Sequence, residues 1–312
     1  MRAKVATALL IVYVVWGSTY LAIALADRSL PPFLMLAVRF AVAGGLLYTW
    51  SWRRGDLAAA RPGRREWGAA AVVGGLLLFV DTGGVAWAEQ RVASGLTALL
   101  IASVPLFTAL IDRTVFGVRL SFGAVAGIAA GLFAVAILVG PSAHIDPIGA
   151  GVILVAALAW AGGSAYARVA PLPQAPFLSA AMQMLCAGAF LAVAGAASGE
   201  VERVHPGAIS LASAGAFGYL IVFGSIVAFT AYGWLLRSGA PSVLVSTYAY
   251  VNPAVAVLLG WLFDGERIGG RELAAGAVIL ASVGMLVLAR HPHAKPAAPA
   301  GVDAASARQQ TS

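Results

Sequence analysis

The sequence predicts an all-helical membrane protein with ten transmembrane helices, arranged as two inverted repeats of five. Its composition is the first reason: 61% of the 312 residues are hydrophobic and only 11% are charged. Soluble proteins are about 45–50% apolar and about 25% charged, so a single soluble core cannot hide this much apolar surface. The composition excludes a soluble enzyme and a disordered chain. The single cysteine, Cys186, excludes an internal disulfide.

Ten apolar segments are the second reason. Each is close to the roughly 20 residues that a helix needs to cross a bilayer, and lipid cannot satisfy the open edges of a sheet. The segments are residues 5–26, 33–52, 68–88, 94–111, 121–139, 148–167, 177–197, 212–236, 243–263 and 272–289. The first has the length of a retained helix rather than of a cleaved signal peptide. Residues 291–312 are rich in Pro, Ala and Ser and are expected to form a disordered cytoplasmic tail.

The distribution of basic residues predicts the orientation, because Arg and Lys favour the cytoplasmic side. With the N-terminus in the cytoplasm, 14 of the 20 basic residues fall on the cytoplasmic side and five in outer loops. The remaining one, Arg39, lies inside a span. We therefore expect both termini to be cytoplasmic. The net charge of +7 is then explained by the basic residues that set the membrane orientation, and no nucleic-acid partner is expected.

The two halves of the chain repeat, which is the third reason. Shifted by 148 positions, the sequence from Ala93 onward falls on Pro241 onward without a gap, so that Pro105 meets Pro253. With five spans in each half, the second half enters the membrane upside down. Inverted repeats are typical of transporters, whose substrate site lies near the midplane between the repeats. The predicted repeats are residues 5–139 and 148–290.

Several motifs resemble the EamA-type proteins of the drug/metabolite transporter superfamily. They are Trp16-Gly17-Ser18-Thr19-Tyr20, Val38-Arg39-Phe40, Ala88-Glu89-Gln90 followed by Ser94-Gly95 and Val104-Pro105-Leu106-Phe107, and residues 246–260 followed by Gly265-Glu266. The resemblance implies two five-helix EamA repeats in the inner (plasma) membrane. It also implies export of amino acids or similar small metabolites, without identifying the substrate.

Soluble-enzyme motifs are missing from the sequence. It contains no P-loop and no His-Glu-x-x-His, and all four histidines lie in predicted loops or the tail. We expect no cofactor or metal. The expected partners are a small-molecule substrate and the lipid bilayer. We expect a monomer that alternates access to a central cavity. A proton-coupled drug exporter or a metabolite importer remains an alternative. A polytopic membrane enzyme or sensor is a more remote one.

Aromatic and polar residues near the middle of spans are the candidates for the cavity wall. Trp16 and Trp160 occupy the first helix of each repeat, with helix packing as the alternative explanation. Hydroxyls beside them either bind substrate or bond to their own backbone. Tyr248 and Asn252 are four apart in helix 9 and share a face. The candidates are Trp16, Thr19, Tyr20, Thr82, Trp160, Ser164, Tyr248, Tyr250 and Asn252, with Gln183 less favoured.

Pro105 and Pro253 are predicted hinges. Each removes a backbone donor and so frees a carbonyl one turn earlier, at Ile101 and near Ala249 respectively. A freed carbonyl can coordinate a polar ligand at membrane depth. A kink needed only for packing is the alternative. Separately, Gly123, Gly127 and Gly131 form a stripe in helix 5 that predicts close packing against helix 10, rather than dimerisation.

Two charges, Arg39 and Asp81, lie within predicted spans. Each costs about 2.5–3.5 kcal/mol at the centre of a helix, so each needs a partner or water. At about 1.5 Å per residue, both lie roughly 10 Å below the outer helix ends. We therefore predict an intramembrane ion pair between them. A contact of Arg39 with Glu89 or with a substrate carboxylate is the alternative.

Overall fold

The computed structural model describes residues 2–26, 29–92, 97, 100–139, 146–263 and 270–288, and every regular element in them is helical. The α-helices are α1 (Arg2–Ala26), α2 (Pro32–Arg53), α3 (Asp56–Ala60), α4 (Arg64–Gly74), α5 (Gly84–Ala88), α7 (Val104–Val115), α8 (Phe122–Val139), α9 (Pro147–Ala167), α10 (Pro176–Ala197), α11 (Leu211–Tyr219), α12 (Thr230–Arg237), α13 (Ser242–Val245), α14 (Tyr248–Phe263) and α15 (Gly270–Leu288). Two π-helical segments, η1 (Gly75–Gly83) and η4 (Leu220–Phe229), and two 3-10 turns, η2 (Glu200–Arg203) and η3 (Pro206–Ala208), complete them.

Each predicted apolar segment contains helix, but not all of these helices are long. Within the described residues, six are long and apolar enough to cross a membrane, and two shorter apolar helices lie at Phe122–Ile137 and Leu273–Leu286. The third predicted span is built from α4, η1 and α5, and the eighth from α11, η4 and α12. The predicted tail, residues 291–312, lies outside the described residues.

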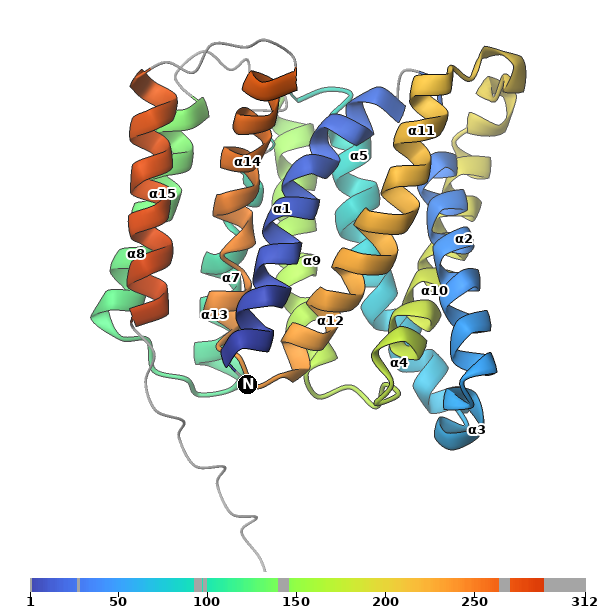
Figure 1. Ribbon diagram of the computed structural model, residues 1–312, viewed down its shortest axis with the longest axis horizontal. Helices are drawn as coiled ribbons and strands as arrows, with labels where there is room; N and C mark the ends of the chain where they lie inside the picture. Colours follow the sequence, from blue (N-terminus) through green and yellow to red (C-terminus); the bar gives the residue numbers. More distant parts are fainter. Residues whose placement is uncertain are drawn as a thin grey trace, which may run out of the picture.

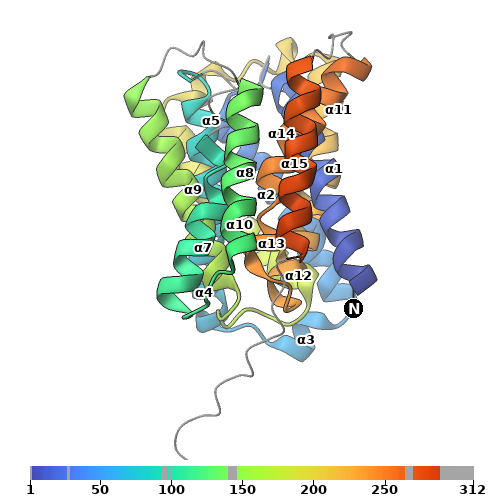
Figure 2. The ribbon, with the colours of Figure 1, turned by 90° about the vertical axis from the view of Figure 1, so that its left-hand side faces the viewer.

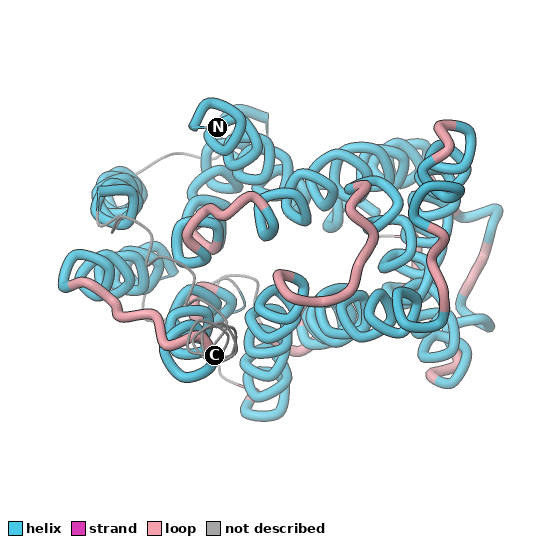
Figure 3. The backbone as a smooth tube through the Cα atoms, turned by 90° about the horizontal axis from the view of Figure 1, so that it is seen from below, coloured by secondary structure: helices cyan, strands magenta, loops and turns pink. Residues whose placement is uncertain are grey.

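The helices form one bundle in which segments far apart in the sequence lie side by side (Figure 1). The α2 helix packs along α10, α1 packs against α14, and α9 packs against η1. Viewed along the bundle, the helices surround its middle (Figure 3). The N-terminal end of α1 lies at the end of the bundle where α9 finishes and α13 begins (Figure 1). The first helices of the two repeats therefore run in opposite directions.

The α8 and α15 helices form a pair at one side of the bundle (Figures 1 and 2). In the glycine stripe of α8, Gly127 packs against α15 as predicted, whereas Gly131 packs against the Tyr250 ring of α14. A side chain at Gly127 would approach the Leu286 Cγ of α15 to 2.8 Å, and the Ser282 hydroxyl donates to the Gly127 carbonyl at 2.7 Å. The pair has its own small apolar cluster, which includes Tyr250, Ile279 and Leu286.

The fourth and ninth predicted helices are broken rather than continuous. A turn at Ala102–Ser103 precedes α7, and Pro105 lies in the first turn of that helix. In the second repeat the break is a turn at Ser246–Thr247, and Pro253 lies inside the α14 helix that follows. The two prolines therefore do not occupy matching places in their helices. Their role as hinges stays a prediction.

The third and eighth predicted helices each contain a π-helical segment. In η1 the Thr82 hydroxyl donates to the Leu77 carbonyl five residues earlier, at 3.1 Å. A π-helical turn makes i→i+5 bonds, and such segments are frequent at functional sites. Both π-helical segments, η1 and η4, face the middle of the bundle, where the largest set of predicted site residues gathers.

Candidate functional site

A cavity of about 150 Å³ lies in the middle of the bundle. Six of the predicted wall residues line it, from four different helical segments: Trp16, Thr19, Thr82, Trp160, Tyr248 and Asn252. Both predicted membrane charges, Arg39 and Asp81, line it as well. The other lining residues are Ile23, Phe40, Leu78, Val85, Ile101, Val104, Gly224, Ser225 and Phe229.

Four aromatic rings form one wall of this cavity and extend behind it. They are Trp16, Trp160, Tyr232 and Tyr248, and each pair of rings is in contact, with centroids between 5.1 and 6.2 Å apart. The Trp160 and Tyr248 rings meet Trp16 edge to face, both at 80°. Such contacts hold the rings rigidly. The wall is thus a fixed apolar surface contributed by both repeats.

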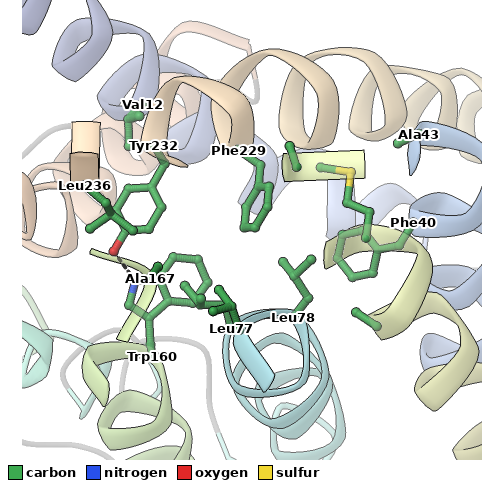
Figure 4. Close-up of a cluster of buried hydrophobic side chains, with 14 of the residues drawn as sticks. Val12, Phe40, Ala43, Leu77, Leu78, Trp160, Ala167, Phe229, Tyr232 and Leu236 are labelled. Atoms are coloured by element: carbon green, nitrogen blue, oxygen red, sulfur yellow. Dashed lines mark hydrogen bonds between the residues drawn. The ribbon is translucent and has the colours of Figure 1, made fainter. Parts of the chain in front are cut away.

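Hydrogen bonds hold the indoles in place. Trp160 Nε1 donates to the Tyr232 hydroxyl at 2.8 Å, which Figure 4 shows, and that hydroxyl is 2.7 Å from the Ser164 Oγ. Trp16 Nε1 donates to the Gly224 carbonyl at 3.2 Å. The Thr19 and Ser164 hydroxyls donate to backbone carbonyls of their own helices, at 2.6 Å each. Their hydrogens are therefore used within the protein.

We expect Tyr232→Phe to lower the melting temperature of the purified protein. Removal of the hydroxyl leaves the buried Trp160 N–H without its acceptor, and an unsatisfied buried donor costs about 1–3 kcal/mol. Tyr48→Phe is the matched control, because the Tyr48 hydroxyl makes no hydrogen bond within the described part of the chain, where its ring contacts Trp67. Equal melting temperatures for the two variants would show that the hydroxyl network contributes nothing to stability.

Arg39 is buried, with 6% of its surface exposed, and its guanidinium faces the cavity. Its Nε donates to the Ser225 hydroxyl of η4 at 2.8 Å. A side chain at Gly224 would come within 2.7 Å of Arg39 Nη2, so this glycine leaves room for the guanidinium. Arg39 is therefore positioned by the π-helical segment of the other repeat.

The predicted ion pair between Arg39 and Asp81 does not form in this structure. Asp81 is 9% exposed and lines the same cavity, but within the described residues no arginine nitrogen lies within 4.0 Å of its carboxylate. The sequence predicted similar depths for the two charged groups, and both do line one cavity. Depth along a helix does not determine direction around it, and the bond to Ser225 turns Arg39 towards η4.

Two other predicted wall residues, Ser164 and Tyr250, do not line the central cavity. Ser164 lies behind the aromatic wall, as described above. Tyr250 is fully buried, its ring packs against Gly131 of α8, and its hydroxyl donates to the Ile128 carbonyl at 3.4 Å. The Tyr20 side chain lies outside the described residues. Gln183 lines a different cavity, between α10 and α12.

Three residues of the site, Tyr232, Ser225 and Phe229, are not among those predicted from the sequence. Tyr232 completes the aromatic wall, Ser225 positions Arg39, and Phe229 lines the cavity. All three belong to the eighth predicted helix, which carries no mid-span charge or proline to draw attention to it. A four-residue spacing of Ser225, Phe229 and Gly233 was the available signal.

A polar cluster joins the two repeats at the end of the bundle where α9 finishes. Arg168 Nη2 contacts Asp112 Oδ1 at 2.6 Å, and Arg168 Nη1 donates to the Ser242 hydroxyl at 2.8 Å. The same hydroxyl donates to Asp112. The Arg168–Asp112 contact is the one salt bridge among the described residues, and it ties α7 of the first repeat to the end of α9 in the second. The hydrogen bonds of Ser242 add the start of α13.

An apolar helical bundle with a charged, aromatic-lined cavity at its centre is the architecture of a multi-pass membrane transporter. The family comparison agrees. The model of the EamA-like transporter family matches residues 3–140 and again residues 147–288. The chain therefore belongs to the EamA-like transporter family, within the drug/metabolite transporter superfamily, and carries two EamA repeats. The resemblance seen in the sequence motifs is confirmed.

Relatives support membership and localisation. The chain is 41% identical over 286 residues to "Uncharacterized inner membrane transporter YedA" of Escherichia coli (strain K12), covering 91% of this chain and 90% of that protein. It is 26% identical to "Protein PecM" of Dickeya dadantii, covering 88% of each. It is 25% identical to "Probable terminal-alkyne amino-acid exporter" of Streptantibioticus cattleyicolor, covering 90% and 92%. The chain is a multi-pass inner-membrane protein, as predicted.

A solved crystal structure has the same fold. It superposes with a TM-score of 0.77 at 21% identity and covers 92% of this chain and 98% of that one.

Proposed function

We propose that the protein is a secondary transporter that exports amino acids or similar small metabolites through the central cavity. The observation that carries the proposal is the presence of two opposite charges, Arg39 and Asp81, on one cavity without a bond between them. A zwitterion complements both: its carboxylate suits the guanidinium and its ammonium group suits the aspartate. The aromatic wall of Trp16, Trp160 and Tyr248 then faces an apolar side chain.

We further propose the topology that alternating access needs. This topology has ten spans, both termini in the cytoplasm, and inverted repeats at residues 5–139 and 148–290. The basic loops and the opposite directions of α1 and α9 support it. The substrate cavity lies between the repeats, as inverted-repeat transporters require. The Arg168–Asp112–Ser242 cluster joins the two repeats at the proposed cytoplasmic end, and the transporter is proposed to act as a monomer.

A counterflow screen of amino acids in proteoliposomes tests the function. We expect at least one amino acid with an apolar side chain to exchange, and Trp16→Ala to reduce its exchange about twofold to tenfold, since stacking and packing on an aromatic face contribute about 0.5–1.5 kcal/mol beyond buried area. Trp52→Ala is the control, because Trp52 is 66% exposed and away from the cavity. Exchange of none of the amino acids would contradict the proposal.

The same vesicles separate the two remaining transport modes. A proton-coupled drug exporter or metabolite importer requires a pH gradient for accumulation, whereas facilitated diffusion equilibrates without one. The amino-acid exporter named among the relatives favours amino acids as the substrate class. The buried Asp81 has no ion-pair partner among the described residues, so it is the group to test for proton coupling.

A further inference from the structure

A second cavity of about 230 Å³ lies beside the central one, between α10 and α12. The two cavities share one side chain, Phe229, which lines both and is only 4% exposed. Figure 4 shows the Phe229 ring projecting from its helix into the space between the Trp160–Tyr232 pair and Leu78. One aromatic ring therefore separates the second cavity from the proposed substrate site.

One helix carries polar groups into both cavities. The continuous run of η4 and α12 contributes to the lining of both cavities. Ser225 lines the central cavity, Gly233 and Arg237 line the second, and Phe229 lines both. This run therefore extends from one cavity to the other.

The second cavity contains buried polar groups that are not fully used. Ser179 and Gln183 of α10 are each 6% exposed, and Gln183 Nε2 donates to the Ser179 Oγ at 3.0 Å. Gln183 Oε1 accepts no hydrogen bond from the described part of the chain, and the Ser179 O–H donates to no atom there. Both groups can therefore bond to a solute in the cavity. Gly74 permits this placement, because a Cβ there would lie 2.3 Å from the Gln183 carbonyl oxygen.

Arg237 supplies the charge of the second cavity. Its Nη1 donates to the Pro173 carbonyl at 2.7 Å, which uses one of the five N–H groups of the guanidinium. No Asp or Glu is among the described residues that line the cavity. A single cation with a planar fork of donors matches a singly charged carboxylate. The central cavity offers the same pair of groups, a guanidinium and a hydroxyl, in Arg39 and Ser225.

We propose that the second cavity is a further binding site for a carboxylate-bearing solute, held by Arg237, Ser179 and Gln183. The guanidinium and the Ser179 hydroxyl donate to the carboxylate, and Gln183 Oε1 accepts from an N–H of the same molecule. The site rests on the proposed function for the identity of the solute, since an exported amino acid carries both groups.

Cysteine labelling tests the site without any transport measurement. Gly233→Cys in a Cys186→Ala background places a thiol in the second cavity, where a side chain at Gly233 meets no atom within 4 Å. The protein, purified in detergent, reacts with an anionic and with a cationic methanethiosulfonate of similar size, and the ratio of the two rates is recorded. We expect Arg237→Gln to lower the anion-to-cation ratio about tenfold, because charged clefts concentrate counter-ions by 10-fold or more.

Two further variants control this measurement. Arg237→Lys keeps the charge and is expected to keep most of the ratio, which separates the loss of charge from misfolding. Arg54→Gln removes an exposed arginine away from the cavity and is expected to change nothing. Equal ratios in Arg237→Gln and Arg54→Gln would overturn the proposal.

Protection from labelling identifies the anion. We expect acetate and glycine to slow the reaction, and methylammonium and anionic phospholipid to leave it unchanged; slowing by the phospholipid alone would assign the cavity to lipid headgroups and overturn the proposal. The outcome is independent of the counterflow screen. Protection by acetate with no amino-acid exchange would remove the proposed function only, and exchange without protection would remove only the second site.

Discussion

Arg39→Gln is expected to weaken the apparent affinity for an exchanged amino acid by roughly tenfold to a hundredfold, because hydrogen bonds to charged groups contribute about 1.5–3 kcal/mol and 1.4 kcal/mol is a factor of ten. The guanidinium is buried, faces the cavity and is fixed by Ser225. Glutamine keeps a donor at about the position of Arg39 Nε but loses the charge and the two terminal nitrogens. Concentration dependence of counterflow in proteoliposomes measures the effect, with Arg54→Gln as the matched control.

Asp81→Asn separates the two ends of the substrate in the same assay. If Arg39 binds the carboxylate and Asp81 the ammonium group, Asp81→Asn weakens the inhibition of counterflow by added amino acid. It does not weaken inhibition by the corresponding carboxylic acid, which lacks the amino group. Arg39→Gln weakens competition by both. An ion pair between the two residues predicts instead that reversal of both charges restores the loss caused by each single reversal. Such rescue would contradict the arrangement described here.

Gly17→Ala is expected to have the largest effect on stability. A Cβ at this position would lie 2.5 Å from Val255 Cβ and 3.3 Å from the Asn252 carbonyl oxygen, so α1 must move away from α14. Overpacking of this kind costs about 1–3 kcal/mol. It also displaces Trp16 and Asn252, which lie on the cavity, so exchange activity falls together with the melting temperature.

Gly45→Ala provides the matched control for this measurement. Gly45 lies inside α2, and a Cβ there meets no atom within 4 Å. The replacement therefore reports only the gain of about 1 kcal/mol that alanine brings to a helix interior. A Gly17→Ala variant that melts as high as Gly45→Ala would show that the two helices are not closely packed at this point.

Hydropathy predicted where the chain is helical, because a span must be apolar along its whole length whatever it packs against. It did not predict which way side chains point. Tyr248 and Tyr250 differ by only two positions, yet one lines the cavity and the other packs against Gly131. Asp81 lies in a π-helical segment, whose i→i+5 bonds rotate later residues away from the positions that an α-helix predicts. Composition carries no signal for that rotation.

The central site was predictable to the extent that its residues are unusual for a membrane. Arg39 and Asp81 are charges at membrane depth, and Trp16 and Trp160 occupy matching helices, so each is conspicuous in the sequence. Ser225 and Phe229 are ordinary residues of an apolar helix. Their role depends on the neighbours that the fold brings to them, Arg39 in one case and the second cavity in the other.

The separate apolar cluster of α8, α14 and α15 affects how this protein unfolds. Most of the bundle shares one core, whereas this cluster is small and lies at the side. Regions with few buried contacts open at lower free energy than the rest of a protein. We therefore expect the α8–α15 pair to detach before the bundle melts, so that unfolding takes at least two steps and has no single midpoint. Variants of Gly17 and Tyr232 then shift the later step, and variants along the glycine stripe of α8 shift the earlier one.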